Sequence, residues 1–186
     1  MYMANNHLKR TYLVRPFLFF FLLIITTGVT NAQKLSKYYT SAMQENGVLY
    51  FIEPKQEFKN SKENSKLTYD LTYLTTKDTV LLNFTYLDNT IRVIDSISII
   101  HGDKHISSIA KKIFIETDKK FWKHRYSSGF LFTDIDLLFQ QEKSPKVVIY
   151  YEKKHTQLGI KSSKWTKQSA IISKILMLIK ANKKSS

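Results

Sequence analysis

The most constraining feature of the sequence is an alternation of apolar and polar residues between positions 66 and 74. In KLTYDLTYL, leucine and tyrosine occupy every second position from Leu67 to Tyr73, with threonine and aspartate between them. A period of two predicts a half-buried β-strand, because successive side chains of a strand point to opposite faces. Two similar runs, 79–87 and 90–100, follow across short polar turns. Connections this short join antiparallel neighbours, so the sequence predicts an antiparallel meander.

Shorter runs rich in β-branched and aromatic residues predict further strands around this meander. They are Val48–Glu53, Lys112–Glu116, Lys120–Tyr126, Lys146–Glu152 and Thr156–Lys161. The polar segment Lys34–Asn46 is expected to form a short helix or an extended arm. Residues 54–65 are rich in lysine, asparagine and serine and are expected to form a loop.

The period changes to that of a helix in two places. From Thr133 to Gln141 the apolar residues recur at i, i+3 and i+4, and Thr133 is the expected N-cap, with Asp136 three residues later. From about Lys164 to Asn182 most apolar side chains, from Trp165 to Ile179, fall on one arc of a helix. Such a face normally packs on a sheet; the alternative is a helix lying on a membrane surface.

The predicted fold class is therefore α+β. We expect a mainly antiparallel sheet of six to eight strands, with a short helix and a C-terminal amphipathic helix packed on it. A β-sandwich closed at one end by the helix is the alternative.

The first 32 residues have the organisation of a secretory signal. Basic residues precede a short apolar run, Phe17–Ile25, and residues 1–32 contain no acidic residue. The small residues Thr30 and Ala32 fit the positions that precede a cleavage site. We expect residues 1–32 to be a signal peptide and residues 33–186 to form a single domain that is periplasmic or secreted.

The alternative for the N-terminus is an uncleaved membrane anchor formed by residues 13–29. Its strongly apolar core is much shorter than the roughly 20 residues that span a bilayer. The chain contains no cysteine, which excludes lipoproteins that are lipidated on a cysteine after the cleavage site. An exported chain without disulfides must be stabilised by its core.

The formal net charge of the whole chain is +14, and the excess of positive charge lies in its C-terminal half. In the segment DKKFWKHRY, basic residues alternate with aromatic ones, a combination that suits a surface facing a polyanion. The candidate residues for such a patch are Lys119, Lys120, Trp122, Lys123 and Arg125. The simpler interpretation is a strand with one apolar face and one solvated face that carries the lysines.

The expected partner of such a patch follows from the export signal. An anionic envelope component or an acidic protein fits better than nucleic acid, which the envelope offers in small amounts. Membrane contact is a less favoured alternative, and the sequence does not define the oligomeric state.

No motif predicts catalytic, cofactor-binding or metal-binding residues. His101 and His105 could share a metal with Asp103, but Gly102-Asp103 predicts a turn, where histidines are ordinary loop residues. A Gly-x-Ser-x-Gly elbow and a glycine-rich phosphate loop are both absent, so we expect no nucleotide cofactor.

The TNAQ end of the leader, the absence of cysteine and the short strands rich in tyrosine, asparagine and lysine resemble small exported proteins of Gram-negative anaerobes. That class has no assigned function, and the resemblance carries over no functional residue. We expect a non-enzymatic periplasmic or envelope domain with a binding or structural role. The alternatives are a divergent envelope hydrolase centred on His124 or His101, and a membrane-associated protein held by its N-terminus.

Overall fold

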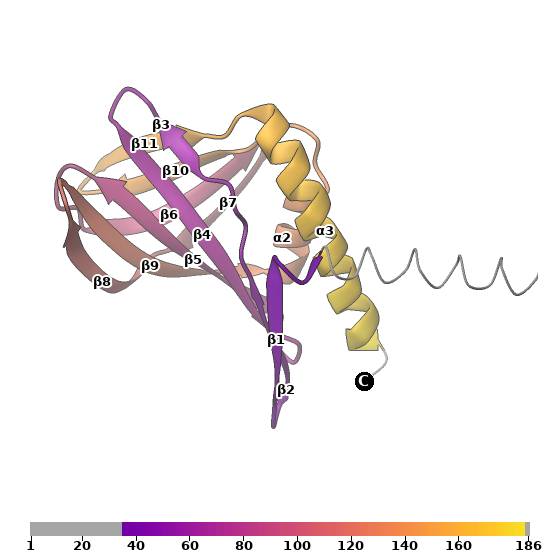
Figure 1. Cartoon of the computed structure of the whole chain (residues 1–186). Coiled ribbons are helices and arrows are strands. Elements are labelled where there is room, and N and C mark those ends of the chain that lie inside the picture. The colour runs from indigo at the N-terminus through magenta and orange to yellow at the C-terminus, as the bar shows by residue number, and fades with distance from the viewer. Residues whose placement is uncertain (1–34, 185–186) are drawn as a thin grey trace, which may run out of the picture. The chain divides into compact units, whose positions relative to one another are not determined.

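The computed structural model describes residues 35–184, and β-strands dominate this part of the chain (Figure 1). From Tyr38 onward the described residues form one compact unit. The predicted signal peptide (1–32) and the alternative anchor (13–29) lie outside the described residues. Within those residues, no helix combines the length and the apolar character that crossing a membrane requires.

The described chain forms eleven strands and two helices. The strands are β1 (Tyr39–Gln44), β2 (Gly47–Ile52), β3 (Phe58–Asn60), β4 (Ser65–Leu74), β5 (Thr79–Asp88), β6 (Ile94–His101), β7 (Lys104–Ile109), β8 (Lys111–Asp118), β9 (Phe121–Leu131), β10 (Lys146–Tyr151) and β11 (Lys154–Gly159). The helices are α2 (Phe132–Phe139) and α3 (Ser162–Lys184).

The predicted α+β class with a dominant antiparallel sheet is confirmed. The sheet has more strands than the six to eight expected, because some strands carry no periodic pattern. β3 lies in the segment predicted to be a loop and buries a single apolar side chain, Phe58. β7 is largely exposed and follows the turn at Gly102. Both strands exist because their backbones pair with neighbours, not because their side chains alternate.

All strand pairs are antiparallel, in the order β7-β6-β10-β11-β3-β4-β5-β9-β8, and the β1–β2 hairpin attaches to β4. The first and last strands of this order, β7 and β8, are consecutive in the chain and are separated only by Ala110. The Ala110 N–H donates to the carbonyl oxygen of Asp95, and the Ser128 hydroxyl donates to that of Ile109. One long, bent segment thus joins the two edges, and the sheet curls into a nearly closed, barrel-like form.

The core fills the space between the concave face of the sheet and the two helices. In β4 the predicted alternation is confirmed, since Leu67, Tyr69, Leu71 and Tyr73 are all buried. From α3, Trp165 stacks on Phe139 of α2 with ring centroids 5.3 Å apart. The further buried apolar side chains of α3 are Ile172, Ile175, Leu176 and Ile179. The expected packing of the C-terminal helix on the sheet is therefore confirmed.

Two details of the helices differ from the prediction. Leu178 belongs to the predicted apolar arc of residues 165–179, but its side chain is 46% exposed because α3 turns that position away from the sheet. α2 begins at Phe132, and its N-cap is Leu131 without a side-chain cap, in place of the expected Thr133. The centroids of the Phe132 and Tyr73 rings lie 4.6 Å apart, and the backbone N–H of Phe132 donates to the Asp78 carbonyl oxygen. Contacts with the sheet therefore set the start of this helix.

Gln168 is a polar residue in the middle of the apolar face of α3. Its side-chain oxygen accepts a hydrogen bond from the Gln56 N–H at 2.9 Å, and its amide nitrogen donates to the Tyr69 hydroxyl at 2.7 Å. Both halves of the amide are satisfied, so this residue ties α3 to the β2–β3 connection and to β4.

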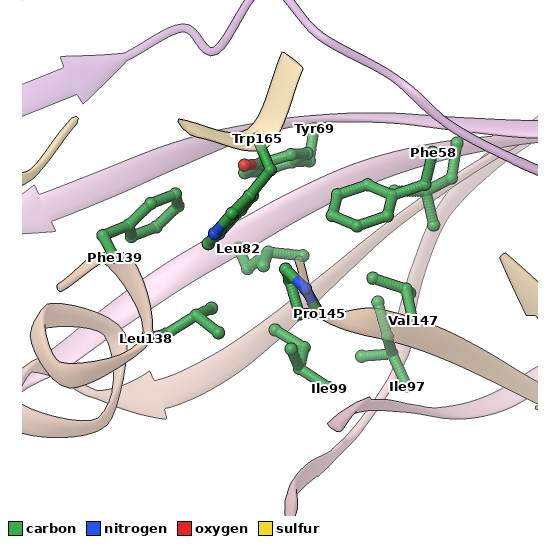
Figure 2. Close-up of a pocket in the computed structure, with 11 residues that line it drawn as sticks. Phe58, Tyr69, Leu82, Ile97, Ile99, Leu138, Phe139, Pro145, Val147 and Trp165 are labelled. Carbon is green, nitrogen blue, oxygen red and sulfur yellow. The ribbon is translucent and has the colours of Figure 1, made fainter. Parts of the chain in front are cut away.

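The apolar interior leaves little room for a ligand. A pocket between the sheet and the helices is lined by residues such as Phe58, Leu138, Val147 and Trp165 (Figure 2). Its volume is about 20 Å³. A water molecule needs roughly 10–15 Å³, so this space could hold about one water molecule and is too small for a ligand.

Candidate ligand-binding cleft

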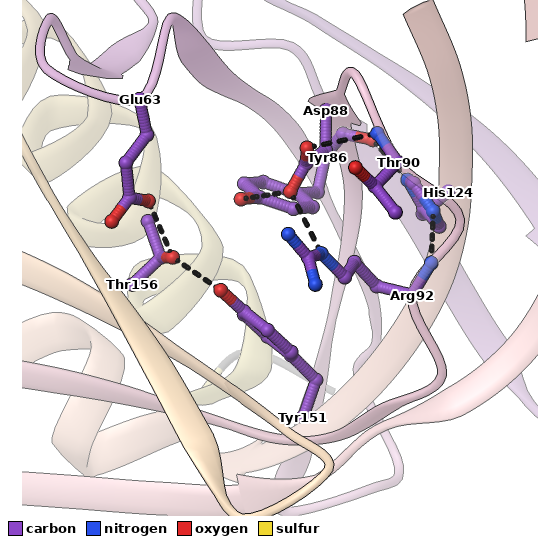
Figure 3. A network of polar contacts seen from close by, with 8 residues as sticks. All are labelled: Glu63, Tyr86, Asp88, Thr90, Arg92, His124, Tyr151 and Thr156. Carbon is purple, nitrogen blue, oxygen red and sulfur yellow. Dashed lines mark hydrogen bonds and ion pairs between the residues drawn. The ribbon is translucent and has the colours of Figure 1, made fainter.

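Polar side chains gather at one end of the barrel-like sheet, where the apolar packing stops (Figure 3). They come from different strands and from the β3–β4 and β5–β6 loops. The cluster, here called the polar plug, consists of Glu63, Tyr86, Asp88, Thr90, Arg92, His124, Tyr151 and Thr156.

Asp88 is the centre of the polar plug. Its Oδ2 accepts hydrogen bonds from the Tyr86 hydroxyl at 3.0 Å and from Arg92 Nε at 3.2 Å, and its Oδ1 accepts from the Thr90 N–H at 3.0 Å. The Arg92 guanidinium lies over the Tyr151 ring, 4.6 Å from its centroid. Burial opposes the charge of Arg92, but the hydrogen bond and the charge of Asp88 raise its pKa above the ordinary value. The ion pair is thus partly buried and well hydrogen-bonded.

His124 is fully buried and has both ring nitrogens occupied by backbone groups. Nε2 accepts from the Arg92 N–H at 2.9 Å, so Nδ1 carries the proton that is donated to the Tyr86 carbonyl oxygen at 3.1 Å. Burial lowers the pKa of His124, which favours the neutral ring. In this arrangement His124 holds the β5–β6 loop and offers no free nitrogen for proton transfer.

A second branch of the polar plug links the β3–β4 loop to the β10–β11 hairpin. The Thr156 hydroxyl donates to Glu63 Oε2 at 2.6 Å, so it accepts from the Tyr151 hydroxyl at 2.8 Å. Glu63 is an exposed residue, and its carboxylate keeps its negative charge while it accepts this hydrogen bond.

Outside the polar plug lies a cleft of about 370 Å³. It is lined by the β3–β4 loop, the adjoining strand ends and the start of β9: Lys59, Asn60, Ser61, Asn64, Ser65, Lys66 and Phe121. Small-molecule pockets typically measure about 300–1,000 Å³, so the cleft has room for a small ligand.

The loop that forms the cleft has a defined conformation. The Asn60 side-chain oxygen accepts hydrogen bonds from the N–H groups of Lys62 and Glu63 at 3.0 and 3.2 Å, which closes a tight turn. Asn64 has a φ of 52°, in the left-handed region that asparagine tolerates better than most residues. Because the Asn60 side-chain oxygen is hydrogen-bonded within the turn, the side-chain NH₂ group of Asn60 is the group that can bind a ligand.

Ser65 forms the inner wall of the cleft and is only 3% exposed. Among the described residues, its hydroxyl is the one buried side-chain polar group without a hydrogen-bond partner. The hydroxyl lies near that of Tyr86, whose pKa is raised mainly by burial and lowered in part by Ser65, yet the two groups do not have the geometry of a hydrogen bond. Leaving such a group unpaired costs roughly 1–3 kcal/mol, and its oxygen lies just behind the cleft wall with almost no accessible surface.

The charges around the cleft are mainly positive. Lys59 pairs with Glu57 at 2.6 Å, and this hydrogen bond lowers the pKa of Glu57. In the part of the chain that the structure describes, neither Lys66 nor the neighbouring Lys119 and Lys120 forms an ion pair. The Lys120 ammonium lies 5.5 Å from the centroid of the Phe121 ring, which itself lines the cleft.

The five residues of the predicted basic patch are divided between different surroundings. Lys119 and Lys120 form the exposed β8–β9 turn beside the cleft. Lys123 and Arg125 lie on the outer face of β9, where they pair with Glu116 and Asp70, respectively. Trp122 is half-buried, and strand alternation directs it to the face opposite Lys123. None of the five residues lines the cleft, but Lys120 lies over the ring of Phe121, which does, and Lys119 precedes it in the same turn.

The remaining residues of the cleft were missed by the sequence analysis. Ser65 and Lys66 open the strand with the clearest alternation, and Asn60, Ser61 and Asn64 belong to a segment that reads only as a polar loop. Phe121 lies inside the DKKFWKHRY segment but was not among the candidates. Nothing local in the sequence indicates that these two segments meet.

The histidines of the β6–β7 hairpin lie apart from the cleft. His101 Nε2 hydrogen-bonds to the Lys143 carbonyl oxygen at 2.7 Å, and His105 Nε2 to the Ser107 hydroxyl at 3.0 Å. His105 pairs with Ile100, so strand alternation directs it and His101 to opposite faces. Among the described residues, no three metal-ligating side chains form a group that could hold an ion.

Comparison of the chain with protein-family models, curated proteins and solved structures finds no match. The interpretation of the cleft therefore depends on its own geometry and charge.

Proposed function

We propose that the chain is an exported, non-enzymatic domain that binds an anionic partner at the cleft. The observation that carries this proposal is a cavity lined by Lys66, which has no ion pair, with the exposed Lys119-Lys120 turn next to its Phe121 wall and the unpaired Ser65 hydroxyl behind it. An anionic group in the cleft would supply both the missing countercharge and the missing hydrogen bond.

Electrostatic attraction supports this choice of ligand. Lys66 lines the cleft from the β3–β4 hairpin, and Lys119 and Lys120 precede its Phe121 wall in the β8–β9 turn. Of the acidic residues close by in the chain, Glu57 pairs with Lys59 and Asp118 with Lys123, whereas Glu63 keeps its charge and offsets part of this positive charge. Charge of one sign around a cavity concentrates ligands of the opposite sign, and the net charge of +11 after residue 32 (26 Lys/Arg against 15 Asp/Glu) adds to this attraction.

A binding role has more support than the hydrolase alternative. A general base needs a nitrogen or oxygen within reach of a substrate proton. The two nitrogens of His124 bind backbone groups, and Asp88 accepts hydrogen bonds from three donors. The polar plug thus has the features of a structural network beneath a binding surface.

The location of this function rests on the predicted signal peptide. Residues 1–32 favour a periplasmic or secreted protein, where anionic glycans and acidic proteins are available partners. Intact mass measurement on membrane and membrane-free fractions tests this part. A species beginning at Gln33 in the membrane-free fraction is expected, whereas full-length protein found only with membranes would favour the anchor of residues 13–29.

The binding proposal is tested with heparin as a polyanion probe. The triple variant Lys66→Gln/Lys119→Gln/Lys120→Gln is compared with the matched variant Lys111→Gln/Lys112→Gln/Lys174→Gln, which loses the same charge at exposed positions outside the cleft. We expect the cleft variant to bind at least tenfold more weakly and with a smaller salt dependence, and the matched variant to change less than threefold. Equal losses in both variants, or binding that does not respond to salt, would refute a cleft-specific anion site.

A further inference from the structure

The lining of the cleft narrows the class of ligand. We infer that the anionic ligand is an acidic sugar unit, meaning a pyranose ring that carries a carboxylate or a phosphate. This inference rests on the proposed function, because it takes for granted that the cleft is the anion-binding site.

The composition of the lining argues against both an apolar ligand and a bare inorganic anion. Four of the seven lining residues carry amides or hydroxyls, two are lysines and one is aromatic. An apolar ligand would leave these amides and hydroxyls desolvated and unpaired, which is costly. A bare inorganic anion would fill little of the roughly 370 Å³ and would not use the Phe121 ring.

Phe121 supplies the surface that a sugar ring needs. The face of an aromatic ring carries partial negative charge and attracts the partly positive C–H groups of a pyranose. Lys120 lies over the same ring, so a cation and an aromatic face are presented together. An acid group on the sugar can therefore meet an ammonium group while the ring packs on Phe121.

The hydrogen-bonding groups of the cleft match sugar hydroxyls, which both donate and accept. The Asn64 amide provides a donor and an acceptor, Asn60 has its NH₂ group left, and the Ser65 hydroxyl can do either. Ser65 Oγ has almost no accessible surface, so a sugar hydroxyl would pair with this unpaired group only after a small shift of the cleft wall. The predicted contacts are thus Phe121 for the ring, Ser65 with the asparagines for hydroxyls, and Lys66 with Lys120 for the acid.

Two variants separate recognition of the sugar from attraction of the anion. Phe121→Ala removes the aromatic face, and its control is Phe114→Ala on β8, since Phe114 is 40% exposed and does not line the cleft. Ser65→Ala removes an unsatisfied hydroxyl, so the melting temperature is expected to stay constant or rise while affinity falls. A drop in both quantities would show that Ser65 acts only in folding.

The experiment is isothermal titration with three probes: tri-galacturonate, its methyl ester and inorganic phosphate. We expect the acidic trimer to bind at least tenfold more tightly than either of the others. Phe121→Ala and Ser65→Ala should each weaken its binding about three- to tenfold, and Phe114→Ala should leave it unchanged.

The outcomes distinguish the inference from the proposed function. If inorganic phosphate binds as tightly as the trimer and Phe121→Ala has no effect, the sugar inference fails and the anion site stands. If the methyl ester binds as tightly as the acid, the acidic part of the inference is wrong. If neither these anions nor heparin binds in a manner that depends on Lys66, Lys119 and Lys120, the proposed function fails as well.

Discussion

Replacing Asp88 by alanine removes the carboxylate on which three hydrogen bonds of the polar plug converge. The Tyr86 hydroxyl and Arg92 Nε would lose their acceptor, and the Thr90 N–H would lose its turn bond. Tyr86 is fully buried, so its hydroxyl cannot turn to solvent for compensation. The variant therefore leaves both a buried hydroxyl and a partly buried guanidinium without their partner.

The size of the effect follows from these two losses. Removing one member of a buried ion pair typically costs about 3–5 kcal/mol, and an unpaired buried hydroxyl costs about 1–3 kcal/mol. The side chain of Arg92 keeps 24% of its accessible surface, so water relieves part of its loss. We expect Asp88→Ala to lower the free energy of unfolding by about 3 kcal/mol. Asp88→Asn retains hydrogen-bond acceptors and should cost about half as much.

The assay is urea unfolding followed by tryptophan fluorescence at pH 7, with the slope against urea held in common. The matched control is Glu116→Ala, which removes the carboxylate of an exposed pair with Lys123. The side chains of this pair keep 33% and 53% of their accessible surface, and exposed pairs contribute only about 0–1 kcal/mol. A loss for Asp88→Ala below about 1 kcal/mol, or equal to the control, would refute the view that the polar plug stabilises this end of the barrel.

Three further substitutions test other parts of the fold. Because burial lowers the pKa of His124 in the folded chain, the unfolded chain binds a proton more readily below about pH 6.5. The contribution of His124 to the free energy of unfolding should therefore be fully present above that pH and should fall on acidification by up to about 1.4 kcal/mol per pH unit. In urea titrations at pH 7 and pH 5, His124→Gln should make the free energy of unfolding less dependent on pH. Gln168→Ala leaves a buried tyrosine hydroxyl unpaired and should cost about 1–3 kcal/mol in thermal unfolding; no change would mean that water replaces the amide. Gly47 has a φ of 126°, and an added Cβ would lie 2.6 Å from the Thr75 hydroxyl, so Gly47→Ala should cost about 1–3 kcal/mol and lower the melting temperature by several degrees. Gly159→Ala, which meets no atom within 4 Å, is the control for that variant.

Local periodicity was sufficient to predict the strands and the helix that form most of the core. The side chains of β4 alternate between the interior and the outside, and those of α3 return every three to four residues, so burial of one face follows from the backbone geometry alone. The same argument could not find β3 or β7. β3 contributes only Phe58 to the core, and β7 contributes almost nothing, so neither has a pattern to read.

The cleft was beyond the reach of a local pattern for a different reason. Its residues lie at the ends of strands, in the β3–β4 loop and at the start of β9, where side chains follow no period. The polar plug beneath them extends from Glu63 to Thr156 along the chain. The cleft segments meet because β4, β5 and β9 are neighbours in the sheet, which long-range strand pairing decides.

By itself, the sequence determined the α+β class, the antiparallel meander and the core face of the last helix, because these depend on side-chain alternation within a few residues. The tertiary structure alone decided which basic residues lie at the same end of the sheet. Alternation along β9 sends Lys123 and Arg125 to the outer face, where Glu116 and Asp70 neutralise them. The turn that carries Lys119 and Lys120 lies at the same end of the sheet as Lys66, because β4, β5 and β9 pair side by side although they are far apart in sequence.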